Sequence, residues 1–130
     1  MANRRMFSKS IIRTDRFVQL PSASQLLYFH LGIEADDDGF VASPLMIIDM
    51  LHCKLGDLET LCMRGFVIAF RSGVIVITEW KQHNYIQSDR YTPTLHKEEK
   101  RMLFEDENKV YRLVNGTESN MLSFSENIAK

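Results

Sequence analysis

The chain has 130 residues, of which 45% are hydrophobic, 25% charged and 10% aromatic. This profile is typical of one soluble globular domain, and it excludes a membrane-spanning protein, because no apolar run approaches the roughly 20 residues that cross a bilayer. The formal net charge of −1 does not by itself indicate a nucleic-acid partner. No signal-peptide pattern follows the basic N-terminus, so we expect a cytoplasmic protein.

The charges are unevenly distributed along the chain. Bases dominate residues 1–16 and 64–101, whereas residues 34–38 carry four acids and no base. This separation would let a near-neutral domain present one basic face, although scattered solvated charges give the same pattern.

The N-terminal third contains one strong helical pattern. Residues 6–12 fit either a short strand or an extended arm, and residues 15–20 fit a helical turn that ends at Pro21. Apolar residues then recur at helical spacing, which predicts an amphipathic helix over about 23–35 with Ser22 as its N-cap.

Two further helices follow a short strand. The acidic turn at 36–39 ends the first helix, and Phe40–Val41 is long enough for one small strand. Ser43-Pro44 is a helix-start signal, and it predicts a second helix over 45–51. A third helix is predicted over about 55–64.

A β-hairpin is predicted after the third helix. Gly65 fits a C-terminal cap, and the runs 66–70 and 74–80 are β-rich and separated by the glycine-containing loop 71–73. The order helix, strand, helix, helix, hairpin predicts a mainly α fold with a small β-hairpin. We interpret it as a winged helix-turn-helix, a three-helix core plus wing, with extra N- and C-terminal segments.

The rest of the chain is less regular. Trp80 is interpreted as a core residue, and a helical patch is predicted over 94–104. Apolar density falls after that, so we predict a winged-helix domain over 1–104 and a linker or partly disordered tail over 105–130.

DNA binding is the leading functional interpretation. A helix about 10–12 Å across fits the major groove, but Asp57 and Glu59 on the outward side of helix 55–64 disfavour base readout. The wing and the flanking basic segments are therefore expected to contribute more phosphate contacts. The predicted DNA-binding residues are Arg4, Arg5, Lys9, Lys54, Thr60, Arg64, Arg71, Ser72, Lys81 and Arg90.

Each of these assignments has a structural alternative. Arg71 fits a solvated loop charge equally well, and the basic N-terminal arm fits a disordered solubilising end. His83, Asn84 and Arg90 have the hydrogen-bonding character of either a structural lock or a phosphate contact, and the alternation with apolar residues favours the lock.

No catalytic, metal or cofactor site is predicted. Cys53 and Cys62 are too few for a zinc site and are interpreted as reduced buried thiols. The four histidines share no metal-ligand spacing. The acidic turn fails as a calcium loop, because the position that needs a bidentate glutamate is Leu45. We therefore expect a protein that is not an enzyme.

Several segments resemble the N-terminal domain of phage replisome organizer (replication initiator) proteins. They lie at 26–32 (LLYFHLG), 35–41 (ADDDGFV), 65–68 (GFVI), 72–78 (SGVIVIT), 80–86 (WKQHNYI), 89–91, 93–94 and 98–100. The resemblance covers about residues 6–103. It implies a winged helix that binds duplex origin DNA in a bacterial host cell and helps recruit helicase-loading proteins of host or phage.

The chain departs from this family at the second helix. Leu45 and Met46 stand where such proteins tend to have lysines, and His52 stands where glycine is common. Leu45 and Met46 are therefore predicted to form a partner surface. The alternative functions are a winged-helix interaction module, which associates with itself or with a replication partner, and a transcription regulator.

Overall fold

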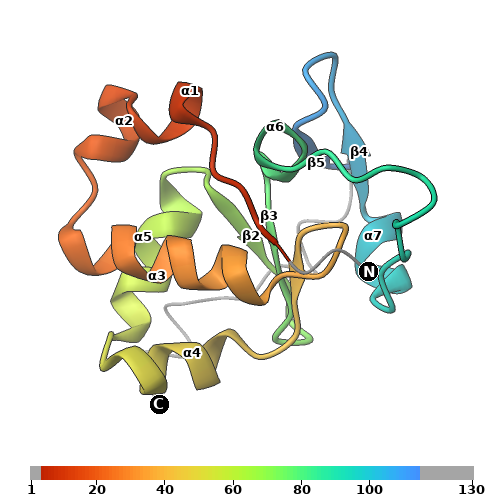
Figure 1. Ribbon diagram of the computed structural model, residues 1–130. Helices are drawn as coiled ribbons and strands as arrows, with labels where there is room; N and C mark the ends of the chain where they lie inside the picture. The colour runs from red at the N-terminus through yellow and green to blue at the C-terminus, as the bar shows by residue number, and fades with distance from the viewer. Residues whose placement is uncertain (1–3, 115–130) are drawn as a thin grey trace.

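The computed structural model describes residues 4–114, and Figure 1 shows their helices and strands. The first part of the chain forms α1 (Lys9–Ile12), α2 (Asp15–Val18), α3 (Ser22–Glu34), β1 (Phe40–Val41), α4 (Pro44–Leu51) and α5 (Leu55–Met63). The second part forms β2 (Val67–Ala69), β3 (Ile75–Ile77), α6 (Trp80–His83), α7 (Lys97–Arg101), β4 (Leu103–Glu105) and β5 (Tyr111–Leu113). Residues 4–114 thus combine helices with small antiparallel sheets, so they are less dominated by helix than the sequence predicts.

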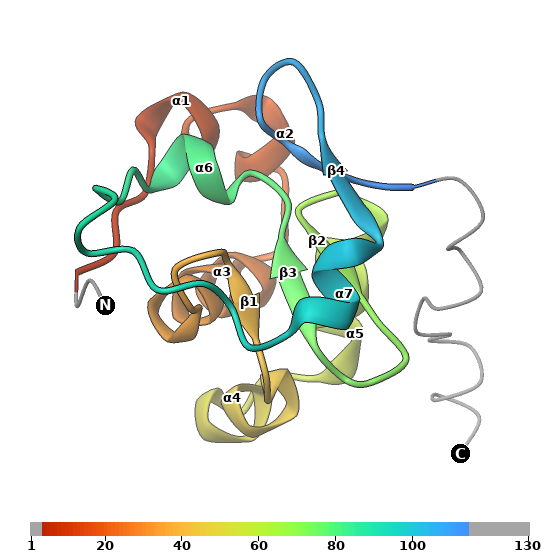
Figure 2. The ribbon, with the colours of Figure 1, turned by 90° about the vertical axis from the view of Figure 1, so that its right-hand side faces the viewer.

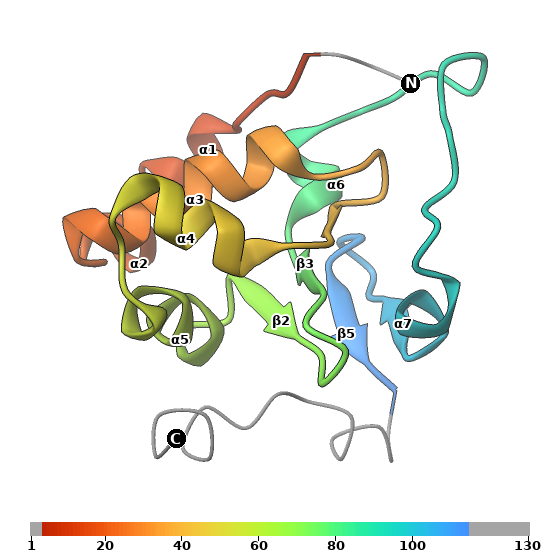
Figure 3. The same cartoon turned by 90° about the horizontal axis from the view of Figure 1, so that it is seen from below.

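The three-stranded sheet lies between two layers. Helices α3, α4 and α5 cover one side, and α7 with the β4–β5 hairpin covers the other (Figures 1 and 3). β3 is the central strand and pairs antiparallel with both β1 and β2. Every residue of these strands is buried, because both faces of the sheet are covered. A strand that is buried on both faces has a continuous run of apolar residues instead of an alternating pattern. This explains why both strands of the β2–β3 hairpin are apolar throughout.

Aromatic side chains fill the layer between the helices and the sheet. The Phe17 ring packs edge-on against Tyr28 and Phe66, with centroids 5.3 and 5.6 Å apart, and Tyr28 packs edge-on against Phe66 at 5.7 Å. Edge-to-face contacts of this kind add about 0.5–1.5 kcal/mol beyond the area they bury. Phe17 comes from α2, so the N-terminal segment belongs to the same core as α3.

The bounds of α3, α4 and α5 agree with the predicted helices to within one or two residues. Ser22 is wrongly predicted as an N-cap, because it is the first residue of α3 and Pro21 precedes it. The helix predicted over 94–104 is also too long, because α7 spans only Lys97–Arg101. Pro44 occupies the first turn of α4, as its fixed φ angle favours, and Gly65 follows α5 with φ +81°. His52, at the C-terminal end of α4, also has a left-handed backbone, with φ 58°. Glycine adopts this conformation without strain, so the backbone at this position favours glycine over histidine.

The second strand of the hairpin is shorter than predicted. β3 ends at Ile77, and Trp80 begins α6 instead of ending a strand. Two side-chain hydrogen bonds hold the chain where it turns from β3 into α6. The Thr78 hydroxyl donates to the Gly65 carbonyl at 2.8 Å, and the Trp80 indole nitrogen donates to the Asp37 carbonyl at 2.9 Å. Trp80 is buried, as predicted for a core residue.

The N-terminal segment is held against the domain by α6. The Met6 amide donates to Asn84 Oδ1 at 2.8 Å, and the Ser8 amide donates to His83 Nδ1 at 2.7 Å. The Ser8 side chain then caps α1 by accepting from the Ser10 amide. His83 and Asn84 therefore have the structural role that the sequence favours for them, because they fix the N-terminal segment to α6.

The acidic turn at residues 36–39 closes on itself. The Asp36 carboxylate accepts hydrogen bonds from the amides of Asp38 and Phe40, both at 3.0 Å. Gly39 has φ +92°, and a Cβ atom there would lie 2.6 Å from the Trp80 side chain. Only glycine satisfies both the backbone conformation and the close packing of Trp80.

The same turn binds segments that are distant in sequence. Its carboxylates accept hydrogen bonds from the Tyr91 hydroxyl, the Thr92 amide and the Thr94 amide, and its backbone accepts from Trp80 and Tyr111. The turn thus uses buried carboxylates as a fixed attachment point for the second half of the chain. Buried charges are tolerated in this way when each is paired or hydrogen-bonded.

The domain extends beyond the predicted boundary at residue 104. β4 and β5 pair across it, with Leu103 opposite Leu113 and Glu105 opposite Tyr111. Tyr111 is buried, and its hydroxyl donates to the Asp38 carbonyl at 2.9 Å. The prediction of a linker is therefore wrong for residues 105–114, and residues 115–130 lie outside the described part. Among residues 4–114, no helix is long and apolar enough to cross a membrane.

Candidate nucleic-acid interface

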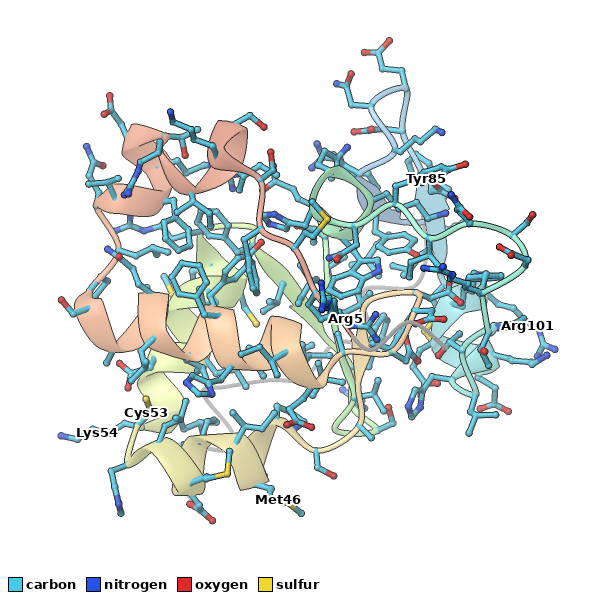
Figure 4. All side chains as sticks on the ribbon, in the orientation of Figure 1. Arg5, Met46, Cys53, Lys54, Tyr85 and Arg101 are labelled. Atoms are coloured by element: carbon cyan, nitrogen blue, oxygen red, sulfur yellow. The ribbon has the colours of Figure 1, made fainter. Side chains whose placement is uncertain are left out.

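The predicted helix-turn-helix and the tip of the predicted wing lie at one end of the molecule. α4, the N-terminal end of α5 and the β2–β3 loop all lie on the side seen from below in Figure 3. Two exposed cations occupy this side. Lys54 immediately precedes α5, and Arg71 lies in the β2–β3 loop. Figure 4 shows the Lys54 side chain extending into solvent.

The start of α5 is stabilised by one of its two acids. The Asp57 carboxylate accepts a hydrogen bond from the Lys54 amide at 2.8 Å, which satisfies a backbone donor at the helix N-terminus. Asp57 therefore caps the helix, a role that its acidic character alone does not predict. Its negative charge still lies within the same turn as Lys54, which weakens this end of α5 as a base-reading surface.

Thr60 and Arg64 are less available than the sequence suggests. The Thr60 hydroxyl donates back to the Gly56 carbonyl at 2.9 Å, within its own helix. Arg64 is exposed at the opposite end of α5 from Lys54, beside the N-terminal helices. There its carbonyl accepts a hydrogen bond from Arg16, which also pairs with Glu79. Neither residue is placed beside Lys54.

The β2–β3 loop is attached to α7. The Ser72 hydroxyl donates to the Glu99 carboxylate at 2.8 Å, so its donor is already used within the protein. Arg71, the neighbouring residue, is exposed and forms no ion pair with any residue between 4 and 114. Of the two predicted loop contacts, Arg71 is the one that remains free to bind a phosphate.

Arg5 is wrongly assigned as a DNA contact. Its side chain is only 5% exposed and lies 3.2 Å from the fully buried Asp37 carboxylate. It also donates to the Ala35 carbonyl at 2.7 Å and lies over the Trp80 ring at 5.3 Å. The side chain cannot reach a phosphate in this position, because it is part of the attachment at the acidic turn (Figure 4).

The remaining predicted cations lie elsewhere. Arg4 is exposed on the N-terminal segment, and Lys9 is exposed on α1, at the opposite end of the molecule from α4 (Figure 1). Lys81 pairs with Glu105 at 2.9 Å on the β4–β5 side. Arg90 is exposed in the segment between α6 and α7. These four residues therefore do not continue the surface formed by Lys54 and Arg71.

A cationic cavity on α7 was not predicted as a site. It has a volume of about 260 Å³ and is lined by Pro93, Thr94, Lys97, Lys100 and Arg101. The three bases are spaced i, i+3 and i+4, which places them on one face of a helix. The spacing can be read from the sequence. The cavity cannot, because it depends on how residues 93 and 94 pack beside α7.

The predicted partner surface on α4 is exposed. Leu45, Met46 and Met50 are 60%, 68% and 59% exposed. Leu45 and Met46 border a cavity of about 510 Å³ that extends from α4 to Gly73 in the β2–β3 loop. Large apolar side chains grouped around a concave surface are typical of an interaction site.

Burial sets the ionisation of two side chains near the core. Burial lowers the pKa of His83 to about 4, so this ring is neutral at pH 7. Burial, followed by the charge of Glu59, raises the pKa of the Cys62 thiol to about 12. A protonated thiol is a poor nucleophile. Cys53 and Cys62 form no disulfide, but both are only partly buried, so the prediction of buried thiols is wrong in that respect.

The ten predicted DNA-binding residues thus fall into separate groups. Lys54 and Arg71 share one end of the molecule, Arg5 is buried, and the other cations lie on different surfaces. The structure adds a basic cavity on α7, which the Ser72–Glu99 hydrogen bond joins to the same loop as Arg71. Comparison of the chain with protein-family models, with curated proteins and with solved structures gave no match.

Proposed function

We propose that this protein is a winged-helix domain that binds duplex DNA. The observation that carries the proposal is the connectivity: α3, β1, α4 and α5 are followed by the β2–β3 hairpin, and the strand order is β1-β3-β2. In this arrangement α4 and α5 form the helix-turn-helix and the β2–β3 loop is the tip of the wing.

Charge supports phosphate contacts over base readout. Lys54 and Arg71 are exposed at the same end as the helix-turn-helix, and neither forms an ion pair among residues 4–114. α5 itself carries Asp57 and Glu59, which disfavour close approach of its surface to the bases and backbone of the groove. The domain is therefore proposed to hold DNA mainly through backbone phosphates, with modest sequence preference.

The natural target is proposed to be a phage or prophage replication origin, where the domain would help recruit helicase-loading proteins. The support for this narrower proposal is the sequence resemblance to replisome organizer proteins. A transcription regulator with the same fold would bind DNA in the same way, and it would differ in the site that it occupies.

Fluorescence anisotropy with a labelled duplex tests the proposal. The protein is compared with a Lys54→Ala/Arg71→Ala variant and with a matched Arg13→Ala/Lys109→Ala control, which removes two exposed charges elsewhere. Each lost phosphate contact should weaken binding on the order of tenfold at 0.1 M salt, because about 0.9 counterion is released per contact. Absence of binding by the unmodified protein at low salt would overturn the proposal.

The exposed face of α4 supports a second candidate function, the docking of a protein partner or of a second copy. Leu45 and Met46 border the cavity that reaches Gly73, and apolar side chains of this size are costly to leave in water. Size-exclusion chromatography with light scattering tests self-association. A dimer that a Leu45→Ser/Met46→Ser variant abolishes would support it, and a strict monomer at high concentration would contradict self-association.

A further inference from the structure

The cavity beside α7 points to a phosphate-binding pocket. We propose that Lys97, Lys100 and Arg101 bind a phosphate group there, and that in the DNA complex this group belongs to the strand that passes the wing. The second part rests on the proposed function, whereas the first part is a property of the cavity itself. The cavity is about 260 Å³ in volume and is bordered by three cations, Pro93 and Thr94, with no acidic residue in its lining.

The sequence of α7 separates its charges onto two faces. Lys97, Lys100 and Arg101 lie within one arc of the helix because a residue advances about 100° around the axis. Glu98 and Glu99 fall on the remaining arc. The two acids thus do not neutralise the basic face, even though the five residues together are nearly balanced in charge.

Contacts with other segments hold this arrangement in place. Glu99 is turned toward the wing, where its carboxylate accepts the Ser72 hydroxyl at 2.8 Å. On the other side, Lys100 Nζ lies 3.4 Å from the Asp38 carboxylate, which is buried and also accepts from Tyr91 and Thr94. Lys100 is therefore a positioned cation at the edge of the cavity.

Lys97 and Arg101 are the free charges of the pocket. Both are exposed, and neither forms an ion pair within residues 4–114. Figure 4 shows Arg101 at the outer edge of the molecule, away from the body of the domain. The Thr94 hydroxyl and amide are already bonded to Asp36 and Asp38, so the binding energy for an anion would come from the cations. Lys97 and Arg101, which pair with no carboxylate within residues 4–114, favour a phosphate ligand.

The position of the pocket explains why a bound strand would reach it. Figure 2 shows α7 lying in front of the sheet, next to the β2–β3 loop, and the Ser72–Glu99 hydrogen bond confirms this proximity. Arg71 immediately precedes Ser72 in that loop. A DNA strand that touches Arg71 carries further phosphates at short, regular intervals, so a basic pocket attached to the same loop extends the contact without any base recognition.

The salt dependence of duplex binding tests the pocket within the DNA complex. A Lys97→Ala/Arg101→Ala variant keeps Lys100 in its contact with Asp38 and removes only exposed side chains, and thermal unfolding checks that it folds normally. The slope of log affinity against log salt should become less negative by about 0.9, since the pocket is proposed to hold one phosphate and each phosphate contact contributes about 0.9. The Arg13→Ala/Lys109→Ala control should leave the slope unchanged. A slope equal to that of the unmodified protein would overturn the DNA part of the proposal.

Titration with inorganic phosphate separates the pocket from the proposed function. Two-dimensional NMR spectra of the protein should show saturable shifts of the amides of residues 94–101, and the Lys97→Ala/Arg101→Ala variant should lose them. If the protein bound no duplex, these shifts would show that the pocket takes a free phosphate, and only the proposed function would be overturned. Absence of shifts together with an unchanged salt slope would overturn the pocket.

Discussion

The guanidinium of Arg5 lies 3.2 Å from the carboxylate of Asp37, and both side chains are removed from water. The two residues are separated by 32 positions, so the ion pair joins the N-terminal segment to the acidic turn after α3. The other oxygen of Asp37 accepts the Thr92 amide at 3.0 Å, which joins the segment before α7 to the same point. One carboxylate therefore connects three parts of the chain.

Arg5→Ala should destabilise the protein by about 3–5 kcal/mol, because it leaves a buried, uncompensated charge on Asp37. Urea unfolding at pH 7 measures this change. The adjacent Arg4→Ala is the matched control, and as a substitution of an exposed side chain it should change stability by less than about 0.5 kcal/mol. Equal effects of the two substitutions would show that the Arg5–Asp37 pair does not hold the fold.

Stability should fall as the pH drops from 6.5 toward 4 because of His83. The folded protein keeps this ring neutral, with a pKa of about 4, whereas the unfolded chain protonates it near 6.5. The unfolded state therefore binds more protons in this window, and the free energy of unfolding decreases by about 2 kcal/mol at pH 5. Protonation of Nδ1 would also remove the acceptor of the Ser8 amide.

A His83→Gln variant provides the comparison for this pH effect. It removes the titrating group, while all other histidines and carboxylates stay the same. The loss of stability between pH 7 and pH 5, measured by urea unfolding, should be smaller in the variant by about 2 kcal/mol. The same loss in both proteins would assign the pH dependence to other groups.

His52→Gly should stabilise the protein by about 0.5–1 kcal/mol, since the left-handed backbone at this position strains a residue with a Cβ atom. Gly65→Ala tests the same principle in the opposite direction. Gly65 has φ +81°, and nothing lies within 4 Å of an added Cβ atom, so a loss of about 1 kcal/mol would come from backbone strain alone. Thermal unfolding of both variants measures the two changes in stability. A His52→Gly variant less stable than the unmodified protein would contradict the explanation.

Tyr111→Ala should cost about 3–5 kcal/mol, in the range for a large aromatic side chain lost from a core. Tyr111→Phe keeps the ring and removes only the hydrogen bond to the Asp38 carbonyl, so about 1 kcal/mol should be lost. Phe104→Ala, at a half-exposed position on the same hairpin, is the control and should have a smaller effect than Tyr111→Ala. A small effect of Tyr111→Ala would mean that the hairpin is not part of the domain.

The parts of the fold that the sequence predicts are those with local signals. The spacing of apolar residues predicts α3, α4 and α5, and Pro44 and Gly65 mark helix ends because their backbone preferences act at single positions. The hairpin β2–β3 is likewise predicted by two apolar runs around a glycine loop. Its second strand is predicted too long, because the bend before Trp80 depends on the Asp37 carbonyl 43 residues away.

The candidate site is predicted less well, because exposure is a tertiary property. Nothing near Arg5 in the sequence indicates that Asp37 will bury it, and a basic N-terminus is typical of a DNA-binding arm. Conversely, Lys97, Lys100 and Arg101 become a candidate site only where α7 and the segment before it enclose a cavity. Trp80 and the acidic turn, which the sequence motifs single out, hold the fold together, so these residues give no direct information about a DNA contact.

The salt dependence of duplex affinity tests the DNA-binding proposal most directly. Measured by anisotropy with the full chain between low and moderate salt, log affinity should fall linearly with log salt. If Lys54, Arg71 and the α7 pocket each neutralise one phosphate, the slope should be about −2.7. No binding at the lowest salt, or an affinity that does not change with salt, would contradict DNA binding through these phosphate contacts.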